Sequence, residues 1–232
     1  MHYFPIALPF LLILFLIFLV LVVMVEIGVL GYAYQRLGIK QHYAFALLLL
    51  SLFGSYLNIP VYQLPAEVLH PGGQEIFFGM RHIVPFVTQW PGTIIAVNLG
   101  GAVIPAVLSI YLLVKNRLFY RGLLSIFIVA VIVHHIAHPV QGVGIAEPIF
   151  IPPLAATGAA LLISRQFAPA LAYISGSLGT LIGADLLNIN RLQGLGAPVA
   201  SIGGAGTFDG IFMTGILAVL LTAVLSGRSR TA

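Results

Sequence analysis

Two aspartates near the C-terminus are the residues whose type and spacing most suggest chemistry. Asp185 lies in LIGADLLN and Asp209 lies in GAGTFDGIF, in two consecutive apolar segments. If these segments form antiparallel helices, the two carboxyl groups lie at similar depth. Carboxyls a few Å apart cannot both ionise, and the proton they share lets one activate water while the other protonates a substrate. The pair therefore predicts a catalytic aspartyl dyad.

Each aspartate also has a purely structural interpretation. Thr207 could cap the last helix, which would place Asp209 where a carboxylate favours the helix dipole by about 0.3 to 1 kcal/mol. Asp185 could hydrogen-bond to a neighbouring helix, together with Asn188 on the same helical face. Both alternatives to catalysis stay open.

The glycine-rich stretch before Asp209 is a candidate binding loop. Its unpaired backbone N–H groups precede a helix and could hold an anion, and Asn98 and Asn188 could add amide groups to the same polar site. The residues of the loop that would contribute are Gly203, Gly204, Gly206 and Thr207. The alternative is a turn that returns the chain to the membrane, and amides that only tie helices together.

Histidines suggest a third kind of chemistry. His134 and His138 in VHHIAHPVQGVG are four residues apart, so on a helix they would share one face and could bind a divalent metal. Glu147, Asp185 or Asp209 could supply a third ligand. Hydrogen-bonded or solvated histidines, or a tetrapyrrole ligand, are the alternatives. We expect no other cofactor, and the absence of cysteine excludes thiolate ligands.

Membrane helices are the elements expected to position these residues. Of 232 residues, 60% are hydrophobic and 7% are charged, against about a quarter charged in a soluble domain. A span needs about 20 apolar residues, and the first apolar run is expected to be a retained span because no basic residue precedes it. The segments that reach or approach this length are about 6–34, 42–59, 92–114, 119–138, 148–164, 168–189 and 207–226.

The distribution of charge predicts the orientation of these seven spans. If they alternate, eight Lys and Arg residues lie on one side and Arg81 and Arg191 lie on the other. By the positive-inside rule the N-terminus is outside and the C-terminus is cytoplasmic. This placement explains the basic charge without nucleic-acid binding. Most acids and histidines then fall on the outer side, which predicts an outward-opening polar site.

Two further features concern the packing of the spans. The outer loop over residues 60–91 contains EVLHPGGQEIFF, whose Pro-Gly-Gly predicts a hairpin that covers the site or lies on the lipid interface. Gly179 and Gly183 are spaced for close helix contact, and Asp185 lies on another face of the same segment. The segment 168–189 is therefore expected to be central.

Three sequence blocks resemble a known family. AVNLGGAVIP, IGADLLNI and SIGGAGTFDGIF are similar to the prokaryotic membrane-protein family called domain of unknown function 1614. This resemblance implies a multi-pass membrane fold and no activity. A weaker likeness is to intramembrane aspartyl proteases of the presenilin and signal-peptide-peptidase type, with Asp185 and Asp209 as the catalytic pair. Here Thr207 and Phe208 separate Gly206 from Asp209, which departs from the protease motif.

The sequence thus predicts an all-α polytopic protein with a single transmembrane domain over residues 1–232, in the inner (cytoplasmic) membrane. The lipid bilayer is its main partner, and a membrane-protein substrate or partner could bind it. An aspartyl-type hydrolase is the first functional hypothesis. A proton- or cation-coupled transporter with Glu26 as an inner station, or an accessory subunit of a membrane complex, are the alternatives.

Overall fold

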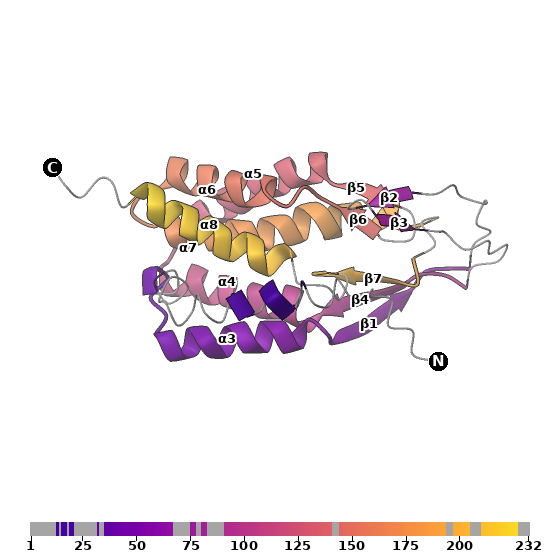
Figure 1. Ribbon diagram of the computed structural model, residues 1–232. Coiled ribbons are helices and arrows are strands. Elements are labelled where there is room, and N and C mark those ends of the chain that lie inside the picture. The colour runs from indigo at the N-terminus through magenta and orange to yellow at the C-terminus, as the bar shows by residue number, and fades with distance from the viewer. Residues whose placement is uncertain are drawn as a thin grey trace.

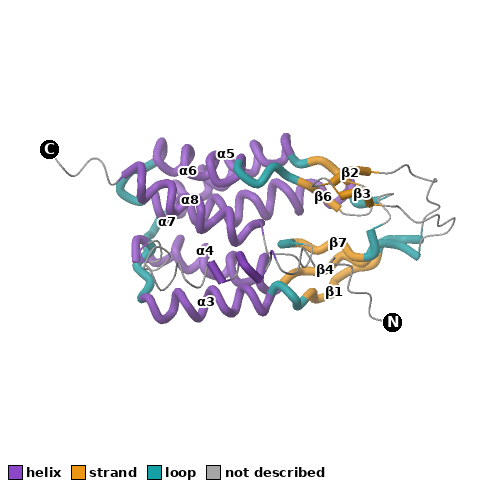
Figure 2. Tube along the Cα trace, in the orientation of Figure 1, coloured by secondary structure: helices purple, strands orange, loops and turns teal. Residues whose placement is uncertain are grey.

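Helices occupy one end of the molecule and strands occupy the other, as the computed structural model shows (Figures 1 and 2). The structure describes residues 13, 15–17, 19–20, 32, 35–66, 75–77, 80–82, 91–140, 144–193, 197–204 and 210–226. The α-helices whose full length lies within the described residues are α3 (Gln41–Gly54), α4 (Ile104–Lys115), α5 (Phe119–Ile136), α6 (Ile151–Ile163), α7 (Ala168–Ile174) and α8 (Gly210–Ser226).

A three-stranded sheet extends from the helices at one end. Its order is β1 (Asn58–Gln63), β4 (Ile94–Asn98), β7 (Val199–Ile202), with β1 antiparallel and β7 parallel to the central β4. Asn58 pairs with Asn98, and Val97 pairs with Ile202. The strand β4 continues into the π-helix that leads into α4, and α8 is the next helix after β7. The pairing of the two strands therefore sets how far α4 and α8 are shifted along their axes relative to each other.

The sheet corrects the prediction of an all-α fold. Residues 58–59 and 94–98 were expected inside membrane helices, but they form parts of β1 and β4. A short apolar run with β-branched residues suits a buried strand as well as a helix, and hydrophobicity alone does not separate the two. The helical part of the third expected span begins at Leu99, as a π-helix (Leu99–Val103) that leads into α4.

Two small hairpins complete the strand end. β2 (Glu75–Phe77) pairs with β3 (Met80–His82), and β5 (His138–Val140) pairs with β6 (Gly144–Ala146). The first lies within the loop 60–91 and pairs Ile76 with Arg81. The hairpin expected around the Pro-Gly-Gly falls outside the described residues, so it stays a prediction.

The central element is an irregular helix over Ala168–Arg191. It begins as α7, continues as two π-helices (Ser175–Gly179 and Leu181–Asp185), and ends as a 3-10 helix (Leu186–Arg191). In its most apolar window, 67% of residues are buried, against 33% for α5. The expected central position of this segment is confirmed.

Glycines let the central helix approach its neighbours, as expected. A Cβ on Gly179 would lie 2.7 Å from Val129 Cβ, and one on Gly183 would lie 2.5 Å from the carbonyl oxygen of Ala130. Both contacts are with α5. Small residues permit this backbone approach where helices associate in lipid.

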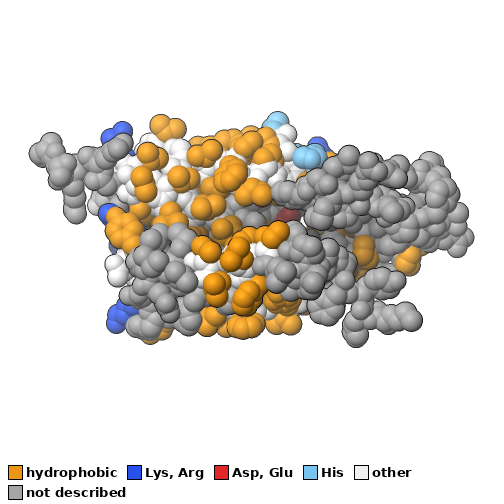
Figure 3. Space-filling view, in the orientation of Figure 1, with side chains coloured by type: hydrophobic (Ala, Val, Ile, Leu, Met, Phe, Trp, Pro, Cys, Tyr) orange, Lys and Arg blue, Asp and Glu red, His pale blue; other side chains and the backbone are white. Residues whose placement is uncertain are grey.

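The length and exposed surface of some helices suit a membrane environment. Within the part of the chain that the structure describes, two helices, Phe119–Ile136 and Ala168–Arg191, are by length and composition apolar enough to cross a membrane, and α6 and α8 are shorter apolar helices. Apolar side chains cover much of the helical surface in Figure 3, and on α5 Leu123 is 63% exposed and Phe127 is 66% exposed. A contiguous apolar surface of this kind suits contact with lipid.

Candidate functional site

Asp185 lies where the central helix meets the sheet. Its Oδ2 accepts a hydrogen bond of 2.7 Å from the backbone N–H of Gly203, directly after β7. Gly203 has a φ of +94°, and a Cβ there would lie 2.5 Å from the nitrogen of Ala102. Glycine is therefore needed at this position both for its backbone conformation and for its close contact with the π-helix Leu99–Val103 that leads into α4.

Asn98 is the centre of a second set of polar contacts. Its Nδ2 donates to the carbonyl oxygen of Ser55 at 2.7 Å and to Asn58 Oδ1 at 3.0 Å, and its Oδ1 accepts from the N–H of Gly101 at 2.8 Å. The hydroxyl of Ser201 donates to the same Asn58 oxygen at 2.6 Å. One buried amide thus connects α3, β1, β4 and, through Asn58, β7.

A side-chain oxygen accepts a hydrogen bond from a glycine N–H just after each of the two parallel strands. After β4, a side-chain oxygen of Asn98 accepts from Gly101, and after β7, a side-chain oxygen of Asp185 accepts from Gly203. Gly204, with φ of +123°, donates its N–H to the carbonyl oxygen of Ser201 at 3.3 Å. Two N–H groups of the predicted anion loop therefore already have acceptors within the protein.

Asn188 is fully buried and bonds to its own helix. Its Nδ2 donates to the carbonyl oxygens of Gly183 and Ala184, each at 2.9 Å. Both carbonyls lie in the second π-helix, Leu181–Asp185, and Asn188 lies in the 3-10 helix that follows it. Its Oδ1 is buried and has no hydrogen-bond partner in the described part of the chain.

Further buried oxygens lie along the same helix. The hydroxyls of Ser177 and Thr180 are buried and, among the described residues, have no hydrogen-bond partner. An unsatisfied buried hydroxyl costs about 1 to 3 kcal/mol. The central helix thus carries three unsatisfied polar oxygens within twelve residues, and Asp185 lies between two of them in sequence.

Part of the predicted site lies outside the described residues. Asp209, Gly206 and Thr207 belong to this part, so the aspartyl dyad stays a prediction. The nearest described position is Gly210, the first residue of α8, whose added Cβ would lie 4.0 Å from Oε1 of Glu147. The start of α8 is therefore beside Glu147.

The two candidate metal-binding histidines lie on different elements. The helix α5 ends at Ile136, so His134 is in its last turn while His138 begins β5. The helical spacing expected for the pair therefore does not occur, because Ala137 is extended and turns the chain into a strand. Among the described residues there is no group of three or more His, Asp or Glu side chains that could hold a metal.

The sequence did not single out Ser55, Ser201 or the hydroxyls of Ser177 and Thr180. Serine and threonine are common in membrane helices as packing residues, so their types gave little signal. The structure shows that Ser55 and Ser201 contact the side chains of Asn98 and Asn58, and that Ser177 and Thr180 lie in an irregular helix.

Comparisons with known proteins agree with part of the sequence reading. A family model described as "Protein of unknown function (DUF1614)" matches residues 52–221, which confirms the first resemblance. The likeness to intramembrane aspartyl proteases finds no support. No curated protein and no solved structure matches the chain.

Proposed function

Because the chain belongs to the DUF1614 family of proteins of unknown function, we propose its function from its own residues: it is a multi-pass protein of the cytoplasmic membrane that conducts or transports protons or small monovalent cations. The path follows the central helix Ala168–Arg191. Asp185 is the carboxylate at which the cation binds on the sheet side.

One observation carries this proposal. Of the two long apolar helices that the structure describes, the more deeply buried is also the irregular one, and its irregular part carries the buried oxygens of Ser177, Thr180 and Asn188, which have no partner in the described part of the chain. Irregular backbone at membrane depth is tolerated where it is enclosed by protein or lines a wet cavity. Transporters place their ion sites at such interrupted helices.

The chemistry of these groups suits a hard cation. Hydroxyl, amide and carboxylate oxygens are the ligands that such ions prefer, and an ionisable residue within a membrane segment marks ion or proton pathways. The unsatisfied hydroxyls would gain a partner when an ion or proton carrier passes. The hydrogen bond from Gly203 holds the Asp185 carboxylate, which lies between Thr180 and Asn188 in sequence.

The test is ion flux in liposomes that contain the purified full-length protein. Proton entry is followed with an enclosed pH-sensitive dye under an imposed membrane potential, and sodium entry is followed with radioactive sodium. We expect flux with the native protein, and a loss of at least about tenfold in Asp185→Asn. Thr180→Val, which keeps the shape of the side chain, should lower flux as well.

Thr222→Val in α8 is the matched control. Thr222 is also a buried threonine, but its hydroxyl already donates to the carbonyl oxygen of Val219 at 2.7 Å. Its flux should equal that of the native protein. Native protein without flux of either ion, or full flux in Asp185→Asn, contradicts the proposal. Cleavage of a membrane-protein substrate that is lost in the same variant would favour the hydrolase.

A further inference from the structure

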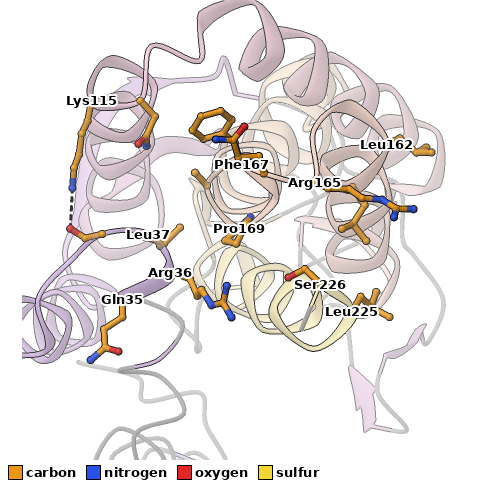
Figure 4. A pocket seen from close by; sticks show the side chains of 15 residues that line it. Gln35, Arg36, Leu37, Lys115, Leu162, Arg165, Phe167, Pro169, Leu225 and Ser226 are labelled. Carbon is orange, nitrogen blue, oxygen red and sulfur yellow. Dashed lines mark hydrogen bonds between the residues drawn. The ribbon is translucent and has the colours of Figure 1, made fainter. Parts of the chain in front are cut away.

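A cavity of about 920 Å³ lies at the helical end of the molecule, away from the sheet (Figure 4). Residues 35–38, the end of α4, the end of α6, the start of α7 and the end of α8 line it. It is separate from the Asp185 region, and the proposed ion path does not account for it.

The charge of this cavity is all of one sign. Arg36, Lys115 and Arg165 line it together with the polar Gln35, Asn116 and Gln166, and none of its lining residues is acidic. In the described part of the chain, no ion pair neutralises these three cations. Figure 4 shows Lys115 on one side of the cavity, Arg165 on the other, and Arg36 between them.

The three cations differ in how they are held. The Lys115 ammonium donates to the carbonyl oxygen of Gly38 at 2.8 Å and lies 5.3 Å from the Tyr111 ring centroid. The Arg36 guanidinium bonds to the Tyr32 hydroxyl. Arg165 is exposed and has no hydrogen bond among the described residues. Lys115 and Arg36 are therefore held in place before a ligand binds, and the Arg165 side chain can move toward the ligand.

Apolar side chains lie beside the cations. Leu162 is 89% exposed and Leu225 is 58% exposed at the edge of the cavity, while the ring of Phe167, also in the lining, lies 5.9 Å from the guanidinium carbon of Arg121. A polar, cationic hollow with an apolar edge matches an anionic head group attached to an apolar chain.

We propose that this cavity binds an anionic phosphate group, either the head group of a membrane lipid or a soluble phosphate compound. An arginine guanidinium can donate two parallel hydrogen bonds to two phosphate oxygens, and a lysine ammonium adds a localised positive charge. Basic pockets between membrane helices on the cytoplasmic side bind anionic head groups. The positive-inside rule explains why basic residues gather at this end, but it does not require them to line one cavity without acids.

Lipid binding by the full-length protein in detergent tests the proposal. Phosphatidylglycerol and phosphatidylcholine are titrated separately, and bound lipid is counted by native mass spectrometry. We expect phosphatidylglycerol to bind more tightly. Arg165→Gln should weaken it about fivefold, the equivalent of about 1 kcal/mol per basic residue near an anionic surface. Because Arg165 has no hydrogen bond among the described residues, this variant should fold normally.

Lys40→Gln is the matched control. Lys40 is an exposed residue at the same end of the molecule, but it does not line the cavity, and its substitution also removes one positive charge. It should change phosphatidylglycerol binding less than twofold. Equal losses in Lys40→Gln and Arg165→Gln overturn the proposal, as does no preference for phosphatidylglycerol over phosphatidylcholine together with no binding of inorganic pyrophosphate.

Competition by inorganic pyrophosphate separates the two sources of the phosphate group. Displacement of phosphatidylglycerol at millimolar pyrophosphate would assign the cavity to a soluble phosphate compound. Retention of the lipid would assign it to the membrane. Because these measurements need no ion flux, their outcome is independent of the transport proposal.

Discussion

The carboxylate of Asp185 and the backbone N–H of Gly203 are joined by a hydrogen bond of 2.7 Å across 18 positions of the chain. This bond connects the end of the second π-helix in the central helix to the turn that follows β7. Since β7 pairs with β4 in parallel, the same bond sets the position of the central helix relative to the start of α4.

Two substitutions of Asp185 separate its structural role from its proposed role in transport. In Asp185→Asn the side-chain oxygen can still accept from Gly203, so we expect the free energy of unfolding to fall by less than about 1 kcal/mol. Asp185→Ala leaves that N–H without its acceptor and should cost about 1 to 3 kcal/mol. Thermal unfolding in detergent measures both, and equal stability of the two variants would contradict the structural role of the bond.

Gly183 is expected to tolerate no larger residue. In Gly183→Ala the new Cβ would lie 2.5 Å from the Ala130 carbonyl oxygen, so the central helix must move away from α5. Overpacking of this kind costs about 1 to 3 kcal/mol.

Gly158→Ala in α6 is the control for Gly183, because a Cβ there meets no atom within 4 Å. We expect Gly158→Ala to be neutral or to stabilise by about 0.5 to 1 kcal/mol, through the better helix propensity of alanine. Melting temperatures of both variants check the pair. A Gly183→Ala protein as stable as Gly158→Ala would show that the close contact with α5 is not required.

We expect the protein to lose stability when the side-chain NH2 donor of Asn98 is removed and its oxygen is kept. Asn98→Asp keeps an acceptor for Gly101 but places a carboxylate against two oxygens, the Ser55 carbonyl and Asn58 Oδ1. We expect a loss of at least about 1 to 3 kcal/mol, the cost of unsatisfied buried groups. Asn116→Asp, at the partly buried end of α4, is the control and should cost less. Unfolding in detergent gives both values.

The orientation predicted by the positive-inside rule can be measured directly, because the chain contains no cysteine. Tyr62 in β1 is 61% exposed, and Tyr120 at the start of α5 is 93% exposed at the other end. In intact cells, a membrane-impermeant maleimide should label Tyr62→Cys. Tyr120→Cys should become labelled only after permeabilisation. The reverse pattern, or labelling of both in intact cells, would reject the predicted orientation.

Much of the helical arrangement was predictable because it depends on local sequence. Apolar length placed the segments that became α5 and the central helix, and the spacing of Gly179 and Gly183 predicted close contact with a neighbour. The family resemblance was also readable, since its blocks are contiguous. Continuous apolar sequence, however, does not distinguish a helix from a buried strand, which is why β4 was taken as part of a span.

Only the tertiary structure decided how the polar groups are used. Asp185 bonds to Gly203, and Asn98 connects Ser55 to Asn58, through contacts between residues 18 to 43 positions apart. The bend of the chain after α5 separated His134 from His138. The sequence alone predicts which segments are buried and where helices pack closely, because burial selects apolar residues and close packing selects small ones. The partners of a polar side chain depend on which segments the fold brings together, since its hydrogen bonds are satisfied across the structure.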